Sequence, residues 1–167
     1  MRFPQIDAFQ FARTGQKLAG RCPAAAFGRL EGMVSASNGE IEYEVSGTGD
    51  DVGRPALRVR LGGELELTCQ RCLKAMPFAL RVDSVLVLAR SEAEMESQPI
   101  EPEGPDWVLG SKELAVGTLL EDEALLAIPF APRHEKCAGD GAPKAETQAS
   151  PFSELRGLLT RGGRARN

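Results

Sequence analysis

Two pairs of metal-ligand residues are the feature of this sequence with the clearest chemical potential. Cys69 and Cys72 are spaced as C-x-x-C, and His134 and Cys137 are spaced as H-x-x-C. A tight turn of C-x-x-C length can direct both thiolates at one Zn²⁺, with Zn–S distances of about 2.3 Å. His134 is the only histidine in the chain. If two loops bring the pairs together, the sequence predicts a closed structural zinc site of three cysteines and one histidine.

Two other interpretations of these residues stay open. Cys69 and Cys72 can be buried thiols, with His134 an ordinary surface residue. They can also form a redox dithiol, because a neighbouring cation such as Arg71 lowers a thiol pKa. The motif follows a strand pattern and does not open an amphipathic helix, which disfavours the redox interpretation. Cys22 has no partner at motif spacing, so we predict a small core or loop residue.

Basic residues accompany both ligand pairs. The four that we predict to be available for RNA are Arg71, Lys74, Arg133 and Lys136. Zn²⁺ with three thiolates and a neutral imidazole carries a net charge of −1, which nearby cations can balance. The same cations can also reach phosphate. Both roles remain open at this point.

The alternation of apolar and polar residues predicts the strands that hold the first pair. Residues 41–45 alternate strictly, as in a half-buried strand. Residues 57–69 keep one parity apolar across Gly62-Gly63, which fits either a hairpin with a Gly-Gly turn or one long strand. Residues 78–88 resume the pattern. We therefore predict two long antiparallel strands with the C-x-x-C motif in the turn between them.

The remaining segments complete a prediction of an α+β fold, in which an antiparallel sheet packs with one main helix. Residues 114–128 are predicted to form this helix, with Glu121-Asp122-Glu123 on its solvent side and Pro129 ending it. Residues 12–21 are predicted to be loop and short strand. Residues 91–106 are acidic, contain three prolines and are predicted to be a mobile loop.

Two domain-level predictions follow from the same pattern. Residues 1–137 are predicted to form a single α+β domain that contains the C-x-x-C and H-x-x-C pairs. Residues 138–167 are predicted to form a flexible tail with a short helix at 151–159.

Composition and charge narrow the class of protein. The 167 residues carry a net charge of −4, distributed as +2 over residues 1–90, −9 over 91–130 and +3 over 131–167. No apolar run approaches the roughly 20 residues that span a bilayer, and residues 1–7 lack an apolar signal core. We therefore expect a cytoplasmic protein that does not enter a membrane, in which cysteines are thiols or metal ligands. The sequence contains none of the nucleophile-elbow, P-loop or dinucleotide motifs, and we expect no enzymatic activity.

Several segments together resemble the YceD family, the large ribosomal RNA subunit accumulation proteins. They are Leu67-Thr68-Cys69-Gln70-Arg71-Cys72-Leu73 with Pro77-Phe78, residues 120–129 with Pro132, His134 and Cys137, Ser150-Pro151-Phe152-Ser153-Glu154-Leu155, and Arg13-Thr14-Gly15-Gln16-Lys17. Ser150 stands where the family usually has Asn. Gly62-Gly63 falls where relatives often continue a strand, which favours one long strand over a hairpin.

The resemblance implies a role in the synthesis, processing or stability of 23S ribosomal RNA, without enzymatic activity and without a small-molecule substrate. The partner would be ribosomal RNA or a large-subunit ribosomal protein. Two alternatives remain. One is a zinc-stabilised protein–protein interaction module, in which the acidic residues 91–130 recruit a basic ribosomal protein. The other is a thiol redox protein.

Overall fold

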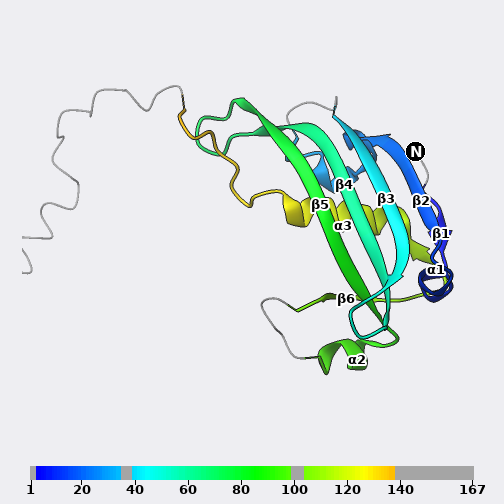
Figure 1. The fold of residues 1–167 in the computed structure, drawn as a ribbon. Helices are drawn as coiled ribbons and strands as arrows, with labels where there is room; N and C mark the ends of the chain where they lie inside the picture. Colours follow the sequence, from blue (N-terminus) through cyan, green and yellow to red (C-terminus); the bar gives the residue numbers. More distant parts are fainter. Residues whose placement is uncertain (1–2, 35–38, 99–103, 138–167) are drawn as a thin grey trace, which may run out of the picture. The chain divides into compact units, whose positions relative to one another are not determined.

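The structure is a computed structural model that describes residues 3–34, 39–98 and 104–137 (Figure 1). Residues Met1–Glu135 form one compact unit, and it contains all the helices and strands of the described residues. The predicted domain boundary after residue 137 stays a prediction. The short helix predicted at 151–159 lies outside the described residues.

A five-stranded sheet forms the body of this unit. In the order in which they pair, its strands are β2 (Lys17–Pro23), β3 (Glu40–Gly49), β4 (Pro55–Thr68), β5 (Ala75–Ala89) and β6 (Asp106–Leu109). The first four run antiparallel to their neighbours, and β6 runs parallel to β5. A two-stranded sheet pairs β1 (Gln5–Ile6) with β7 (Leu114–Ala115). The predicted mixed α+β fold with a mainly antiparallel sheet is confirmed.

The structure decides between the hairpin and the single long strand. Gly62 and Gly63 lie inside β4 and pair with β3 on one side and β5 on the other. A Cβ atom at Gly63 would lie 2.4 Å from the carbonyl oxygen of Glu40, so glycine is needed for β3 to approach. The single-strand interpretation is confirmed, and so is the antiparallel return through β5.

The helices differ from the sequence predictions at three places. α1 (Ala8–Thr14) occupies the start of a segment predicted as loop and strand, and Asp7 caps it by accepting from the Gln10 N–H at 2.9 Å. Residues 91–106, predicted as a mobile loop, include the short helix α2 (Glu92–Glu96) and the start of β6. The main helix α3 is Val116–Ala127, because Leu114 and Ala115 pair with β1.

The core lies on one face of the sheet, where α3 crosses behind the long strands (Figure 1). The two short 3₁₀ turns η1 (Ala24–Ala26) and η2 (Gly28–Leu30) extend it. The prediction that all three acids of α3 face solvent is wrong, because Glu123 is buried and accepts from the Ser84 hydroxyl at 2.5 Å. Glu121 and Asp122 both pair with the Arg29 guanidinium, at 2.8 and 2.7 Å.

Within the described residues, no helix has both the length and the apolar character that a membrane crossing requires.

Candidate metal centre

The C-x-x-C pair lies in the tight turn that joins β4 to β5. Cys69 directly follows β4, and its N–H donates to the Lys74 carbonyl at 2.9 Å. The Leu73 N–H donates back to the Cys69 carbonyl, also at 2.9 Å. Leu73 has a positive φ of 58°, a left-handed conformation that is uncommon for a leucine. These bonds close the turn, and the sulfur atoms of Cys69 and Cys72 lie within 4.8 Å of each other.

The chain after α3 lies against this turn. The Gln70 N–H donates to the Pro132 carbonyl at 2.8 Å. The Arg71 guanidinium donates to the His134 carbonyl at 3.3 Å. Both bonds join segments more than 60 residues apart in the sequence. Together these bonds place His134, the only histidine of the chain, at the end of the β4–β5 hairpin.

The four predicted ligands come together at this point. The ligand atoms of Cys69, Cys72, His134 and Cys137 all lie within 4.8 Å of one another. The Cys72 sulfur is 3.4 Å from Nδ1 of His134. Tetrahedral Zn²⁺ with ordinary Zn–S and Zn–N bonds would place a sulfur and a nitrogen about 3.6 Å apart. The donor set and its spacing therefore fit one tetrahedral ion.

A second contact fixes which nitrogen of His134 faces the cysteines. Nε2 lies 3.1 Å from the carbonyl oxygen of Ala75. A carbonyl can only accept, so Nε2 carries the proton, and in the neutral imidazole the lone pair of Nδ1 then faces Cys72. Metal-bound histidines usually donate their second N–H in this way to a carbonyl or carboxylate. Sequence reasoning did not find the Ala75 carbonyl, because a backbone acceptor leaves no residue-type signal.

Cys69 is set up as a thiolate. Its burial works against ionisation and raises the pKa. The backbone N–H groups of Cys72, Arg71 and His134, together with the Cys72 side chain, donate to its sulfur and bring the pKa of Cys69 down to about 5. A thiolate is the form that binds metal. This environment supplies the negative ligand without a separate deprotonation step at neutral pH.

The surroundings favour a metal ligand over a redox thiol. Cys69 has no exposed surface, whereas reactive redox thiols are partly exposed so that a substrate can reach them. Cys22 lies apart from the cluster, in the core, where burial and then the charge of Glu40 raise the pKa of its thiol. The prediction of a core residue at Cys22 is confirmed.

The four predicted RNA-contacting residues are all exposed: Arg71, Lys74, Arg133 and Lys136. The Arg71 side chain contacts the other loop through the His134 carbonyl. The backbone carbonyl of Lys74 accepts from the Cys69 N–H within the turn. Their role in binding RNA stays a prediction.

The comparison with protein families gives a match over most of the chain. Residues 57–159 match the family described as large ribosomal RNA subunit accumulation protein YceD, which covers 103 of the 167 residues. The matched segment contains β4 from Leu57 onward, β5, α3 and all four candidate ligands, whereas the basic residues 13–17 lie outside it. No curated protein and no solved structure matches the chain.

Proposed function

The chain belongs to the YceD family of large ribosomal RNA subunit accumulation proteins, and on that premise we propose that it is a ribosome-biogenesis factor that contacts 23S ribosomal RNA directly. The family match is the observation that carries this proposal, since it implies a role in accumulation of the large-subunit RNA. The family is not known for enzymatic activity. The protein would act by binding RNA during its synthesis, processing or stabilisation, without a chemical step of its own.

Zinc is the ion that the candidate metal centre would hold. Three thiolates and one imidazole in tetrahedral spacing form a donor set typical of structural zinc sites. Such an ion would tie the segment after α3 to the turn between β4 and β5. Cys69, Cys72, His134 and Cys137 would occupy all four positions, so the ion has a structural role and no open position for catalysis.

The cations beside the ligands would supply the contact with RNA. Arg71 lies between Cys69 and Cys72, and the other three lie within two positions of a ligand in the sequence. Because the ligand atoms lie within 4.8 Å of one another, the residues that flank them would present these exposed cations close together. Lysine and arginine at such positions bind phosphate without reading sequence. This contact would position the protein on RNA, and specificity would come from RNA shape.

A gel-shift titration on fragments of 23S ribosomal RNA tests the proposal. Wild-type protein should bind at low salt, and the logarithm of the binding constant should fall linearly with the logarithm of salt concentration. A variant with Arg71→Gln, Lys74→Gln, Arg133→Gln and Lys136→Gln should bind more weakly and with a shallower salt dependence. Its matched control is a variant with Arg21→Gln, Arg29→Gln, Arg58→Gln and Arg60→Gln, which changes the net charge equally at residues that form ion pairs.

Two outcomes would count against direct contact, namely the absence of binding at low salt and binding that does not depend on salt. Equal weakening in the variant and its control would instead show that the cations beside the metal centre do not make the contact. Pull-down of a large-subunit ribosomal protein that survives nuclease treatment, without RNA binding by the purified chain, would replace RNA with protein as the partner.

A further inference from the structure

A second basic surface lies at the end of the sheet opposite to the metal centre. It is a hollow of about 770 Å³ between α1, the β3–β4 turn and the segments that follow β5 and β6. Arg13, Arg90 and Lys112 line it, and Asp7 is the only acid among its lining residues. β4 runs from this hollow at Pro55 to the metal-centre turn after Thr68. At the usual rise per residue this separates the two by about 40 Å.

Backbone hydrogen bonds and close packing hold the segments that carry the three cations around the hollow. The residue before Lys112 accepts from the Ala8 N–H at 2.9 Å, which joins that loop to α1. The residue before Arg90 accepts from the Gly110 N–H at 2.8 Å, which joins the end of β5 to the same loop. α1 itself lies directly on β3, because a Cβ atom at Gly47 would meet the Phe11 carbonyl oxygen. Three segments distant in sequence therefore place one cation each on a shared rim.

The cations of this hollow lack acidic partners. All three are exposed, and none forms a salt bridge with any residue of the described ranges. The one acid in the lining, Asp7, accepts the capping N–H of Gln10 and forms no salt bridge with these cations. Near Arg90, the Glu94 carboxylate accepts from the backbone N–H and not from the guanidinium.

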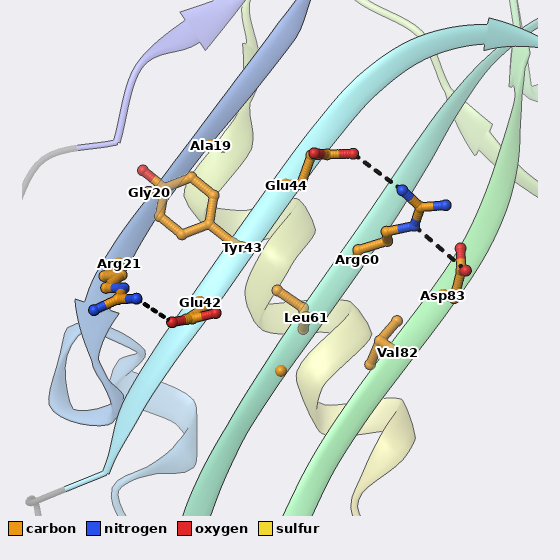
Figure 2. Close-up of a pocket in the computed structure, with 11 residues that line it drawn as sticks. Ala19, Gly20, Arg21, Glu42, Tyr43, Glu44, Arg60, Leu61, Val82 and Asp83 are labelled. Carbon is orange, nitrogen blue, oxygen red and sulfur yellow. Dashed lines mark hydrogen bonds and ion pairs between the residues drawn. The ribbon is translucent and has the colours of Figure 1, made fainter.

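Another hollow lies on the face of the sheet, and its cations differ from those of the first hollow, which we call the end hollow. Figure 2 shows that the arginines of the hollow on the sheet face pair with acidic side chains beside them. Arg21 pairs with Glu42 at 2.5 Å, and Arg60 lies between Glu44 and Asp83 at 3.2 and 3.4 Å. These arginines already have anionic partners, so an incoming phosphate would have to compete with them. The cations around the end hollow have no such competitor among the residues that the structure describes.

Apart from its charge, the lining of the end hollow has two further features that suit a nucleotide chain. Gly15, Gly47 and Gly49 border the hollow, and no described atom lies within 4 Å of a Cβ position at Gly15. A ligand can therefore come close to the backbone there. Phe9 also lines the hollow, half-buried, with its ring against Gly110. An aromatic ring beside cations is the combination that binds single-stranded RNA, by stacking a base while the cations hold phosphates.

We propose that the end hollow is a second RNA-contact site, in which Arg13, Arg90 and Lys112 hold phosphates of a single-stranded segment and Phe9 stacks on a base. The identity of the ligand rests on the proposed function, whereas the position of the site does not. With the cations of the metal centre about 40 Å away, one RNA could engage both ends of the sheet.

Fluorescence anisotropy with a labelled single-stranded RNA of mixed sequence tests this site. The test variant carries Arg13→Gln, Arg90→Gln and Lys112→Gln, all at exposed positions. The control carries Arg21→Gln, Arg58→Gln and Arg60→Gln, which lowers the net charge by the same amount at paired arginines. In the test variant, loss of three phosphate contacts should reduce the salt slope by about 2 and weaken binding at 50 mM salt on the order of a hundredfold. The control should bind within a few-fold of wild type.

A Phe9→Leu variant adds a readout that net charge does not affect. It should weaken binding by roughly tenfold while the salt slope stays unchanged, because stacking releases no counterions. If wild-type protein binds but the triple test variant and its control lose affinity equally, the end hollow is not an RNA-contact site, and the proposed function stands. If wild-type protein does not bind RNA at low salt, direct RNA contact fails and this site fails with it.

Discussion

The sulfur of Cys72 lies 3.4 Å from Nδ1 of His134, although the two residues are 62 positions apart in the chain. This distance is close to a sulfur–nitrogen edge of a tetrahedral zinc site, about 3.6 Å. The opposite nitrogen of the same ring is held by the Ala75 carbonyl at 3.1 Å. The imidazole is therefore oriented from both sides, with its lone pair on the side of the cysteines.

The first prediction concerns metal content. Elemental analysis of untagged protein should find one zinc per chain in the wild type and none after Cys69→Ser, because the substitution removes a buried thiolate ligand. Cys22→Ala is the control, since it removes a core thiol outside the cluster and should retain zinc. Zinc retained by Cys69→Ser, or absent from the wild type, would contradict the site.

The role of His134 gives a second prediction. His134→Ala should weaken zinc affinity by at least roughly 10- to 100-fold, since even loss of an outer-shell partner has an effect of that size. Competition with a chelator of known affinity measures the change. The control is Glu135→Ala at the adjacent exposed position. Equal affinities in the two variants would mean that the fourth ligand is another group.

Ser84 and Glu123 provide a test of the core. Ser84→Ala removes the hydroxyl that donates to the buried Glu123 carboxylate at 2.5 Å. A buried acceptor without its partner destabilises a protein by about 1–3 kcal/mol. Denaturant unfolding should show a loss of this size, whereas Ser111→Ala at an exposed position should change the free energy of unfolding little. Equal unfolding curves for Ser84→Ala and wild type would show that the bond contributes no stability.

Gly47 is predicted to be intolerant of any side chain. A Cβ atom there would lie within 2.8 Å of the Ala12 Cα and still closer to the Phe11 carbonyl oxygen, so Gly47→Ala must push α1 away from β3. Overpacking of this kind costs about 1–3 kcal/mol. Gly62→Ala is the matched control in a neighbouring strand, because a Cβ atom there meets nothing within 4 Å. Thermal unfolding of both variants measures the difference, and similar melting temperatures would refute the close approach.

The lowered pKa of Asp83 predicts that the free energy of unfolding depends on pH in the acidic range. Hydrogen bonds from the Arg58 guanidinium, with the charges of Arg58 and Arg60, lower the pKa of Asp83 from 3.8 to about 2 against the opposing effect of burial. Because the folded-state pKa is depressed, the stabilisation is complete above about pH 4 and is lost as the pH falls through 2.

Asp83→Asn should therefore be less stable than wild type at pH 6, with a difference that shrinks as the pH falls from 4 to 2. Chemical unfolding at several pH values measures this difference. Asp51→Asn, at an exposed residue without a salt bridge in the described ranges, controls for the removal of one negative charge. A difference that stays constant from pH 6 to pH 2 would contradict the assignment.

The long strands and the position of the C-x-x-C turn were predictable from the sequence, because they depend on local periodicity. Apolar residues alternate over residues 57–69 and again over 78–88, which predicts strands on both sides of the C-x-x-C turn. The alternation left a hairpin or one long strand open at Gly62-Gly63, and the family resemblance favoured the long strand. The four candidate ligands could also be picked out from the sequence, since cysteine and histidine at motif spacing are rare enough to stand out, and the structure brings them together. The family followed from the order of these motifs along the chain, and the match over residues 57–159 confirms it.

Tertiary contacts decided the rest. Glu123 is on a helix with two other acids, and only its position opposite Ser84 makes it a buried acceptor. The proton on Nε2 of His134 depends on a carbonyl 59 residues away in the sequence. The three cations of the end hollow come from α1, the end of β5 and the loop after β6, and no spacing in the sequence relates them. Sequence patterns record which neighbours a residue has along one element, whereas these features depend on which elements the fold places side by side.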